Sequence, residues 1–423
     1  MKTAYVVIGA NFGDEAKGKT VDAIVKRIVE GGKRPVVCRF NGGGQAGHTV
    51  IVDGVRHIFS HVGAGALRGA ATYLSRHFIV NFFTLKKELD LLSSYGKFSE
   101  VIIDPCARVT LLADMMINNM IERKRGNGRH GSCGLGINET VTRSEAEGGK
   151  FCLNAQAVDL AIFNPEEGAE ELAQRMFKIC NEWIPQRLYS LGFAREEIGP
   201  ELADVTSIES LRKQARDMVE LARQRVTIMT PSFVKLSDYE VVFEGAQGLM
   251  LDEFMGFFPH VTRSMTGLPN AIEAASSLGV RKLIPIYTTR AYLTRHGAGP
   301  LSHEGEKFAE IDSVEDATNI ENEWQGQIRY APLNLTLMNN FITKDIRRGQ
   351  NMAPQFNIEI SGPQIALQCL DQIGRYARVY GLDNKAHEIE TGNLAQFVTE
   401  ETGIPVTIKS DGPTAESVYF LTD

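Results

Sequence analysis

Apolar runs of strand length alternate with longer amphipathic stretches along most of the chain. Residues 4–8, 35–40 and 239–243 are short and largely apolar, which is typical of buried β-strands. Residues 21–29 and 84–94 instead carry apolar side chains at three- and four-residue spacing, as amphipathic helices do. Because strands and helices that alternate in this way build parallel sheets, the pattern predicts an α/β fold with a mostly parallel sheet.

The pattern predicts several further elements. Strands are expected at 78–80, 101–103 and 282–287, and a helix is expected at 107–125. Asp53-Gly54 lies between two apolar runs and is a hairpin signal. Residues 155–225 are rich in Glu, Ala, Leu, Arg and Gln, which predicts an insertion of several helices. We find no internal repeat or linker, so residues 1–423 are expected to form a single large domain.

The composition fits a large globular protein and excludes some classes. The chain has 423 residues, of which 43% are hydrophobic and 23% are charged, and its net charge is -7. This balance argues against binding of nucleic-acid polymers, because no basic excess exists to neutralise a phosphate backbone. The six cysteines form no C-x-x-C pair, and no signal peptide or membrane-spanning apolar run is found. We therefore expect a cytoplasmic protein that binds no membrane.

The first predicted strand runs into a glycine loop with an unusual interior. Gly13 to Thr20 fits the phosphate-loop pattern G-x-x-x-x-G-K-[ST], and a helix follows it. Such a loop presents backbone N–H groups and a helix N-terminus to phosphates, so we expect a P-loop-NTPase-like nucleotide-binding core. Asp14 and Glu15 place negative charge where a plain phosphate cradle would avoid it. A carboxylate beside bound phosphate indicates a magnesium ligand or a general base.

Other predicted strands end in glycine-rich loops that carry single polar residues. His48, Gln247 and Asp371 each follow an apolar run, and Arg329 lies in a polar stretch. Each has a structural interpretation: a loop histidine bonded to the backbone, a turn glutamine, a helix N-cap and a surface arginine. Each also has a functional one, because loops at the carboxyl edge of a parallel sheet bind ligands. The histidine would neutralise phosphate charge, the glutamine and aspartate would bind purine edges, and the arginine would hold a carboxylate.

Six short motifs follow one another along the chain. They are Phe12 to Lys19, Gln45 to Thr49, Phe243 to Gly248, Pro259 to Thr262, Thr294 to Pro300 and Ser410 to Pro413. The series resembles the adenylosuccinate synthetase family, and the resemblance spans nearly the whole chain. It implies a ligase of purine nucleotide biosynthesis that condenses IMP with L-aspartate, driven by GTP and magnesium. Members of this family are typically homodimers.

The resemblance implies a catalytic role for three residues. Asp14 would be the general base that takes the N1 proton of the purine, so that O6 attacks the γ-phosphate of GTP. His48 would act as the acid that stabilises the charge leaving towards GDP, and Gln247 would hold the region of the 6-oxygen. Asp14 and the backbone carbonyl of Gly47 would bind magnesium. The amine of aspartate then displaces phosphate from C6, because phosphorylation turns a poor leaving group into a good one.

The other implied contacts divide by ligand. Contacts to GTP would come from Gly13, Asp14, Glu15, Ala16, Lys17, Gly18, Lys19, Gly47, His48, Thr49, Asp371, Ser410, Asp411 and Gly412. Contacts to the substrate nucleotide would come from Asp14, Lys17, Gln45, Gly47, His48, Cys133, Arg143, Gln247 and Thr262. Arg143 is also the candidate for an arginine that crosses into the site of a partner subunit. Aspartate would be held by Gln325, Gln327 and Arg329.

The chain departs from the family pattern at positions that face the substrates. Gln45 replaces an asparagine, Cys133 replaces a threonine that would bind the IMP phosphate, and His296 replaces a valine in the loop that contacts the ribose. A run of arginines in the aspartate loop is reduced to Arg329, and Gln327 stands where an arginine usually lies near the ribose 2′-hydroxyl.

These departures spare the predicted catalytic pair, Asp14 and His48. We therefore expect phosphoryl-transfer chemistry to be kept, and two alternatives stay open. One is the same chemistry on dGMP or another 6-oxopurine nucleotide. The other is a non-catalytic nucleotide-binding switch that binds GTP without forming a product.

Overall fold

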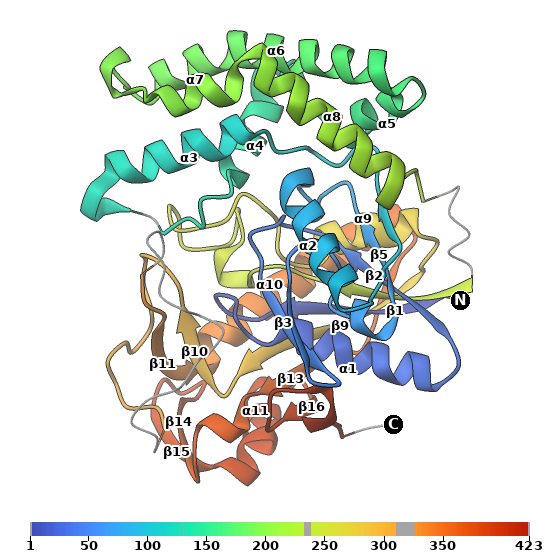
Figure 1. Cartoon of the computed structure of the whole chain (residues 1–423). Coiled ribbons are helices and arrows are strands. Elements are labelled where there is room, and N and C mark those ends of the chain that lie inside the picture. Colours follow the sequence, from blue (N-terminus) through green and yellow to red (C-terminus); the bar gives the residue numbers. More distant parts are fainter. Residues whose placement is uncertain (1, 130, 232–237, 310–325, 422–423) are drawn as a thin grey trace.

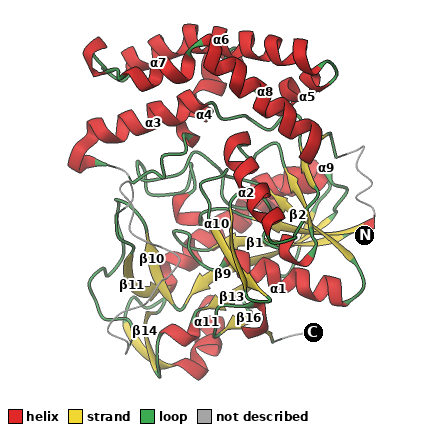
Figure 2. Ribbon diagram, viewed as in Figure 1, coloured by secondary structure: helices red, strands yellow, loops and turns green. Residues whose placement is uncertain are grey.

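The computed structural model describes residues 2–129, 131–231, 238–309 and 326–421. Its centre is an 11-stranded, mostly parallel sheet (Figure 1, Figure 2). The strands follow the order β17 (Val418–Phe420), β16 (Val406–Ser410), β13 (Gln364–Gln368), β9 (Lys282–Arg290), β1 (Thr3–Gly9), β8 (Tyr239–Glu244), β2 (Arg34–Arg39), β5 (Ala71–Leu74), β6 (Val101–Ile103) and β7 (Thr227–Ile228), and β12 (Glu359–Ile360) pairs with β9. The predicted α/β class is confirmed. In the described part of the chain, no helix is long and apolar enough to cross a membrane.

Both faces of the central strand β1 are covered by helices. Val7 belongs to a core that includes side chains of α1 (Lys17–Glu30), whereas Val6 and Ile8 belong to a second core with α9 (Leu268–Ser277) and α10 (Leu335–Met352). A strand that is buried on both faces needs apolar side chains at every position. This explains the continuous apolar run that predicted the strand.

The strands that matter for function all end at one edge of the sheet. β1 pairs in parallel with β8 and β9, β2 pairs in parallel with β8, and β13 pairs in parallel with β9 and β16. Their carboxyl ends therefore lie side by side. The loops that follow these strands carry most of the predicted site residues, so the sheet itself collects them.

A layer of helices covers one side of the sheet domain (Figure 1). It contains α3 (Leu112–Arg125), α4 (Ile137–Glu145), α5 (Ala155–Ile162), α6 (Pro165–Ser190), α7 (Pro200–Thr206) and α8 (Ile208–Arg225), next to α2 (Phe82–Ser94). Residues 155–225, expected to be helical, thus hold α5 to α8. Met176 of α6 and Met218 of α8 join the same core as Val7, so the layer packs continuously onto the sheet.

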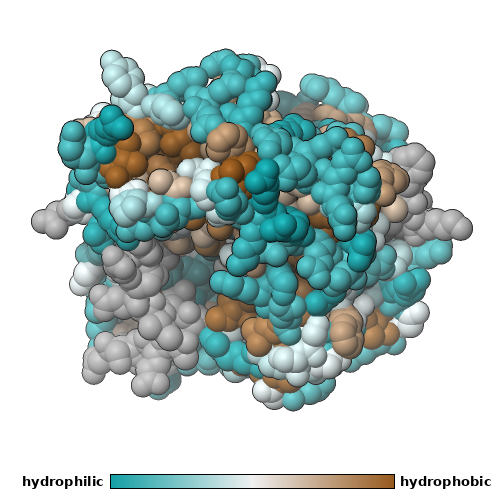
Figure 3. Space-filling model, turned by 45° about the horizontal axis from the view of Figure 1, so that its top comes forward, coloured by the Kyte–Doolittle hydropathy of each residue, from teal (hydrophilic) through white to brown (hydrophobic). Residues whose placement is uncertain are grey.

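The helical layer also carries a cavity lined by both apolar and charged residues. Met116, Met120, Phe193 and Leu202 line this cavity of about 400 Å³ between α3 and the segment that leads into α7. Hydrophobic side chains are gathered on this side of the molecule in Figure 3. Because every residue that lines the cavity belongs to the helical layer, the cavity is separate from the edge of the sheet where the loops meet.

Two smaller sheets flank the main one. The hairpin of β3 (His48–Val52) and β4 (Val55–Phe59) turns at Asp53 and Gly54, whose φ values are 50° and 79°, as the sequence predicted. A four-stranded sheet of β10 (Tyr292–Arg295), β11 (Arg329–Asn334), β14 (Tyr376–Tyr380) and β15 (Ala386–Glu390) was not predicted. α11 (Leu394–Thr402) precedes β16.

Two predicted elements are wrong in their bounds. Residues 78–80 make only isolated bridges, Ile79 with Gly43 and Val80 with Val109, and the strand beside β2 is β5 instead. The helix expected over 107–125 begins at Leu112, because residues 107–111 are extended and Val109 N donates to Leu153 O at 2.8 Å. Apolar spacing alone does not distinguish such an extended, buried lead-in from a helix.

Candidate active site

The loop between β1 and α1 is held in an uncommon backbone conformation. Gly13, Asp14 and Ala16 have φ values of 95°, 56° and 57°. This left-handed region costs a residue with a side chain about 1–2 kcal/mol. Neighbouring strands stabilise the loop: Thr294 Oγ1 donates to Gly13 O at 3.3 Å, and Arg290 Nε donates to Asp14 O. The loop therefore takes its shape from tertiary contacts.

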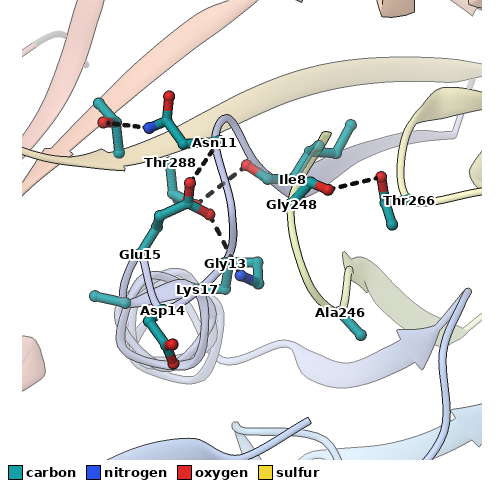
Figure 4. A network of polar contacts seen from close by, with 12 residues as sticks. Ile8, Asn11, Gly13, Asp14, Glu15, Lys17, Ala246, Gly248, Thr266 and Thr288 are labelled. Atoms are coloured by element: carbon teal, nitrogen blue, oxygen red, sulfur yellow. Dashed lines mark hydrogen bonds and ion pairs between the residues drawn. The ribbon is translucent and has the colours of Figure 1, made fainter. Parts of the chain in front are cut away.

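Glu15 and Asp14 point to opposite sides of this loop (Figure 4). Glu15 turns inward, where Asn11 N donates to its Oε1 at 2.5 Å and Lys17 Nζ lies 3.6 Å from its Oε2. Burial raises the pKa of Glu15 to about 7, although Lys17 and the Asn11 N–H oppose the rise. The absence of a side chain at Gly9 makes room for the Glu15 carboxylate, since a Cβ at Gly9 would lie 2.2 Å from Glu15 Oε2. The Glu15 carboxylate thus shapes the loop from within.

Asp14 keeps a partly exposed carboxylate. Its side chain is 29% exposed, and its Oδ2 lies 3.1 Å from His296 Nε2. Burial raises the pKa of Asp14, but the hydrogen bond to His296 and the positive charges of Arg290 and Lys17 outweigh this and lower it below its ordinary value. Asp14 is therefore an ionised carboxylate at neutral pH, as a general base must be.

His48, at the start of β3, is almost fully buried and held by a second carboxylate. Its Nδ1 lies 2.5 Å from Glu244 Oε1, and Ala64 N donates to Glu244 Oε2 at 3.0 Å. Burial lowers the pKa of His48, against the effect of Glu244. Burial would raise the pKa of Glu244, but Arg39 and His48 lower it. A neutral imidazole that donates Nδ1–H to an ionised carboxylate follows, which leaves the unprotonated Nε2 as an acceptor.

Gly18 brings His48 onto the first turn of α1. A Cβ at Gly18 would lie 2.7 Å from His48 Cβ, so a larger residue would push the strand away. Gly47 and Thr49 flank His48; Gly47 is exposed, and Thr49 pairs with Ile58 in the hairpin. The glycine of the phosphate-loop pattern thus has a packing function here as well, because it sets the distance between the helix and the histidine.

The C-terminal loops reach the same turn of α1. Lys19 Nζ donates to Ser410 Oγ and, at 2.6 Å, to Gly412 O. Burial lowers the pKa of Lys19, while the nearby carboxylates of Asp371 and Asp411 oppose the fall. The residues predicted to contact GTP from the first and the last parts of the chain are therefore gathered around this one ammonium group.

Two glutamine side chains beside the loop have buried amide atoms without hydrogen-bond partners among the described residues. Gln247 follows β8 with a φ of 56°, and its Oε1 is buried with no hydrogen bond to any described residue. The same holds for both amide atoms of Gln45. A Cβ at Gly42 would lie 3.1 Å from Gln247 Oε1 and 3.6 Å from Gln45 Nε2, which places the two amides together. Buried amides without partners are costly, so a polar ligand fits this place.

Two more loops that carry predicted residues pack against this region. Cys133 lies before α4 on a loop whose Gly131 packs closely on Gly297. Burial raises the pKa of the Cys133 thiol, so this position is neutral. Thr262 N donates to Leu251 O at 2.8 Å in the long segment between β8 and α9. The place of Cys133 and Thr262 at a substrate stays a prediction.

The predicted aspartate-binding residues are only partly described. Arg329 begins β11 opposite Arg295 in β10, and its guanidinium donates to Gly297 O and to Glu304 Oε2, each at 2.8 Å. Gln327 is exposed next to this strand. Gln325 lies outside the described residues. Because Gly297 follows His296, Arg329 lies on the same side of the fold as Asp14.

The prediction for Arg143 is wrong. Its side chain is fully buried, and Asp114 accepts from its Nε at 2.9 Å and from its Nη2 at 2.8 Å. The remaining donors meet Phe151 O at 2.7 Å and Val109 O at 2.8 Å. A guanidinium that is satisfied inside the helical layer cannot reach a substrate or cross into a partner subunit.

Sequence reasoning missed residues whose partners are far away in the chain. Glu244 was quoted only as part of a motif, yet it holds His48 from a separation of 196 residues. His296 was noted as a departure from the family pattern, yet it touches Asp14. In the sequence, the signal for Glu244 is a charged residue directly at the end of an apolar strand. The structure shows that Glu244 is fully buried, so its charge needs a partner inside the protein.

The fold and the site define a nucleotide-dependent enzyme of the α/β class. A parallel sheet presents an ionised carboxylate, two buried lysines and a carboxylate-held histidine around one helix N-terminus. The chain belongs to the adenylosuccinate synthetase family, whose sequence model matches residues 6–324.

Individual relatives agree with this family. The adenylosuccinate synthetase of Candida glabrata is 28% identical over 327 residues, which cover 72% of this chain and 68% of that protein. That of Natronomonas pharaonis is 31% identical over 316 residues, covering 70% of this chain but only 63% of that protein's own length. The match to the Porphyromonas gingivalis enzyme, at 26% identity, covers 99% of both chains.

Solved structures share the fold over its whole length. The fully ligated adenylosuccinate synthetase of Plasmodium falciparum superposes with a TM-score of 0.72, at 16% identity and with 99% of each chain covered. The succinoaminodeoxyadenylate synthetase of cyanophage S-2L superposes with a TM-score of 0.61, at 13% identity, covering 100% of this chain and 96% of that one. At these identities the likeness concerns the fold alone.

Proposed function

We propose that the chain is a ligase that couples L-aspartate to C6 of IMP at the expense of GTP and so forms adenylosuccinate in purine nucleotide biosynthesis. The observation that carries the proposal is the pairing of an ionised Asp14 with a Glu244-held His48 at the first turn of α1. A loop that only cradled phosphate would need neither group.

Asp14 begins the proposed reaction. Its carboxylate accepts the N1 proton of the 6-oxopurine, and the electron pair of N1–H moves through the ring to O6. O6 then attacks the γ-phosphate of GTP, and the bond from that phosphate to GDP breaks. His296 holds Oδ2 of Asp14, so the carboxylate enters this step in a fixed orientation.

His48 and the glutamine pair serve the charges that develop. Phosphate near Nε2 of His48 favours protonation of the imidazole, so that it donates Nε2–H to the leaving phosphate while Glu244 balances its charge. The unpartnered Oε1 of Gln247 and the unpartnered amide of Gln45 suit the polar edge of the purine near O6. The His48–Glu244 pair would neutralise the charge on the phosphate, and the glutamines would position the purine. Phosphoryl transfer requires mainly these two contributions from a protein.

The second step uses the phosphate as a leaving group. The amine of aspartate attacks C6, and the C6–O6 bond breaks with release of inorganic phosphate. Arg329 would hold a carboxylate of the amino acid on the side of the fold where His296 meets Asp14. Lys19 and the loops at Asp371 and at 410–412 would hold GTP.

A magnesium ion would join these ligands. Asp14 would offer an ionised carboxylate and Gly47, an exposed residue, its backbone carbonyl; both are oxygen donors of the kind that Mg²⁺ prefers, and phosphate oxygens would complete its shell. The ion would supply charge neutralisation for the phosphates. We also propose a cytoplasmic homodimer, in which Arg143 stays bonded to Asp114 of its own subunit.

A substrate screen tests the proposal. Phosphate release is measured with GTP, magnesium and aspartate and with IMP, dIMP, GMP or dGMP as the acceptor, and mass spectrometry detects the adduct. We expect phosphate release that needs both IMP and aspartate, with adenylosuccinate as product. A preference for dGMP, the ligand of the cyanophage enzyme, would replace IMP in the proposal. GTP binding without any product would contradict it.

A further inference from the structure

Arg329 is already engaged by a carboxylate of this chain. Its Nη2 donates to Gly297 O at 2.8 Å and to Gly299 O at 2.9 Å, which fixes the guanidinium to the loop after β10. Its Nη1 donates to Glu304 Oε2 at 2.8 Å. The Glu304 side chain is 43% exposed, so this ion pair lies at the surface and can open without unpacking the core.

The loop around Glu304 is anchored without this ion pair. The ring of His303 stacks on Tyr380 with centroids 3.5 Å apart, and Tyr380 OH donates to Glu306 Oε2 at 2.7 Å. Asn334 Nδ2 donates to Ser302 Oγ at 2.9 Å. Contacts on both sides of Glu304 therefore hold the backbone. The Glu304 carboxylate is therefore not needed to keep the loop in place. Its main effect is on Arg329.

We propose that Glu304 is an internal competitor for the carboxylate of the amino-acid substrate. It occupies Nη1 of Arg329 and gives up this contact when the substrate carboxylate binds. This inference rests on the proposed function, which places aspartate at Arg329. The apparent affinity for the substrate is reduced by the fraction of molecules in which Arg329 is paired with Glu304. Exposed ion pairs are weak, so the reduction corresponds to about two- to sixfold.

Glu304 also contributes to specificity. An amine without a carboxylate cannot displace Glu304 from Arg329. Such an amine gains no ion pair at Arg329, because Glu304 already balances the charge of this arginine. A dicarboxylate supplies the same chemical group that Glu304 supplies, so exchange at Nη1 costs no unpaired charge. The device thus sets the concentration of the amino acid at which the enzyme works and excludes simple amines.

Steady-state kinetics of Glu304→Gln test the inference. We expect the KM for aspartate to fall about two- to sixfold, while the KM for IMP stays within twofold. Glu306→Gln is the matched control, because it removes the same charge two residues away from a group that meets Tyr380 and Arg378 instead of Arg329. In an Arg329→Gln background, Glu304→Gln should have no further effect on the KM for aspartate.

Two results overturn the inference. One is a KM for aspartate that stays the same or rises in Glu304→Gln, and the other is an equal fall in Glu306→Gln. Binding of succinate, a dicarboxylate without an amine, separates this inference from the proposed function. If the wild-type protein makes no product from aspartate but Glu304→Gln binds succinate more tightly by the same factor, the proposed function fails and the competition at Arg329 stands.

Discussion

At the scale of single residues, the site gives two adjacent carboxylates opposite environments. Glu15 is enclosed and its pKa is raised to about 7, whereas the pKa of Asp14 is lowered by His296, Arg290 and Lys17 against the effect of burial. Active sites commonly separate the proton affinities of neighbouring groups in this way. Of the two, only Asp14 combines a lowered pKa with a partly exposed carboxylate, which favours it as the proposed base.

Asp14→Asn tests this assignment. The amide cannot accept the N1 proton but keeps the shape of the side chain, so kcat should fall at least about 10²-fold. Binding of GTP, measured by calorimetry, should change little, because Lys19 and the loop backbone remain. An Asp14→Asn enzyme with near wild-type turnover would contradict the assignment.

Glu244→Gln tests the carboxylate behind His48. A glutamine can still bond Ala64 N, so the fold should persist, but it no longer balances a charged imidazole. We expect kcat to fall about 10- to 100-fold, with a smaller change in the KM for GTP. Glu240→Gln, in the same strand and paired with Lys33 at the surface, is the control and should behave as the wild type. Equal activities of the two variants would show that Glu244 has no such function.

At the scale of elements, the N-terminal turn of α1 lies beside His48 because β3 packs closely on this turn. Gly18 has no positive φ, so alanine would suit the helix backbone. The constraint is the 2.7 Å that would separate the new Cβ from His48 Cβ. The phosphate loop and the histidine are therefore coupled through one glycine.

Gly18→Ala measures this coupling. We expect kcat to fall by at least about tenfold through displacement of His48, because misplacing a catalytic group is costly. Gly392→Ala, at a glycine with open space around it, is the matched control. Thermal unfolding of both variants shows whether the loss of activity reflects unfolding. Unchanged kcat in Gly18→Ala would contradict the account.

The N-terminus of α9 depends on a carboxyl group in α10. Asp345 is fully buried, accepts from Leu268 N at 2.9 Å and from Tyr287 OH at 3.0 Å, and burial raises its pKa to about 7. Because this pKa lies above the value of 3.8 expected for an unfolded aspartate, the protonated group favours the folded state. Its contribution to stability is present at low pH and is lost as the pH rises through about 7.

Asp345→Asn should remove this pH dependence. An amide keeps both contacts, so the variant should lose less unfolding free energy than the wild type between pH 5 and pH 8. The difference between the two pH values has an upper bound of about 2.7 kcal/mol, because about two pH units separate pH 5 from the folded pKa of about 7, at 1.36 kcal/mol for each unit. Urea unfolding at the two pH values measures it. Parallel losses of stability in the two proteins would show that Asp345 titrates as an ordinary aspartate.

At the scale of the whole molecule, the sheet brings distant loops to one edge. The alternation of strands and helices in the sequence predicted the parallel sheet and its loops, because local patterns report local structure. The sequence could not reveal that Glu244 meets His48 or that His296 meets Asp14, because strand order and register create these contacts. The resemblance implied a substrate contact for Arg143 for a related reason: the sequence could not reveal that Asp114 binds this arginine inside the helical layer.

The central claim is that GTP activates O6 of the purine, and labelled substrate tests it most directly. IMP that carries ¹⁸O at position 6 is turned over with GTP, magnesium and aspartate, and the released phosphate is analysed by mass spectrometry. The account predicts that the label moves into inorganic phosphate, one ¹⁸O for each adduct formed. Phosphate without ¹⁸O would mean that water attacks GTP and that O6 is never phosphorylated, which would contradict the account.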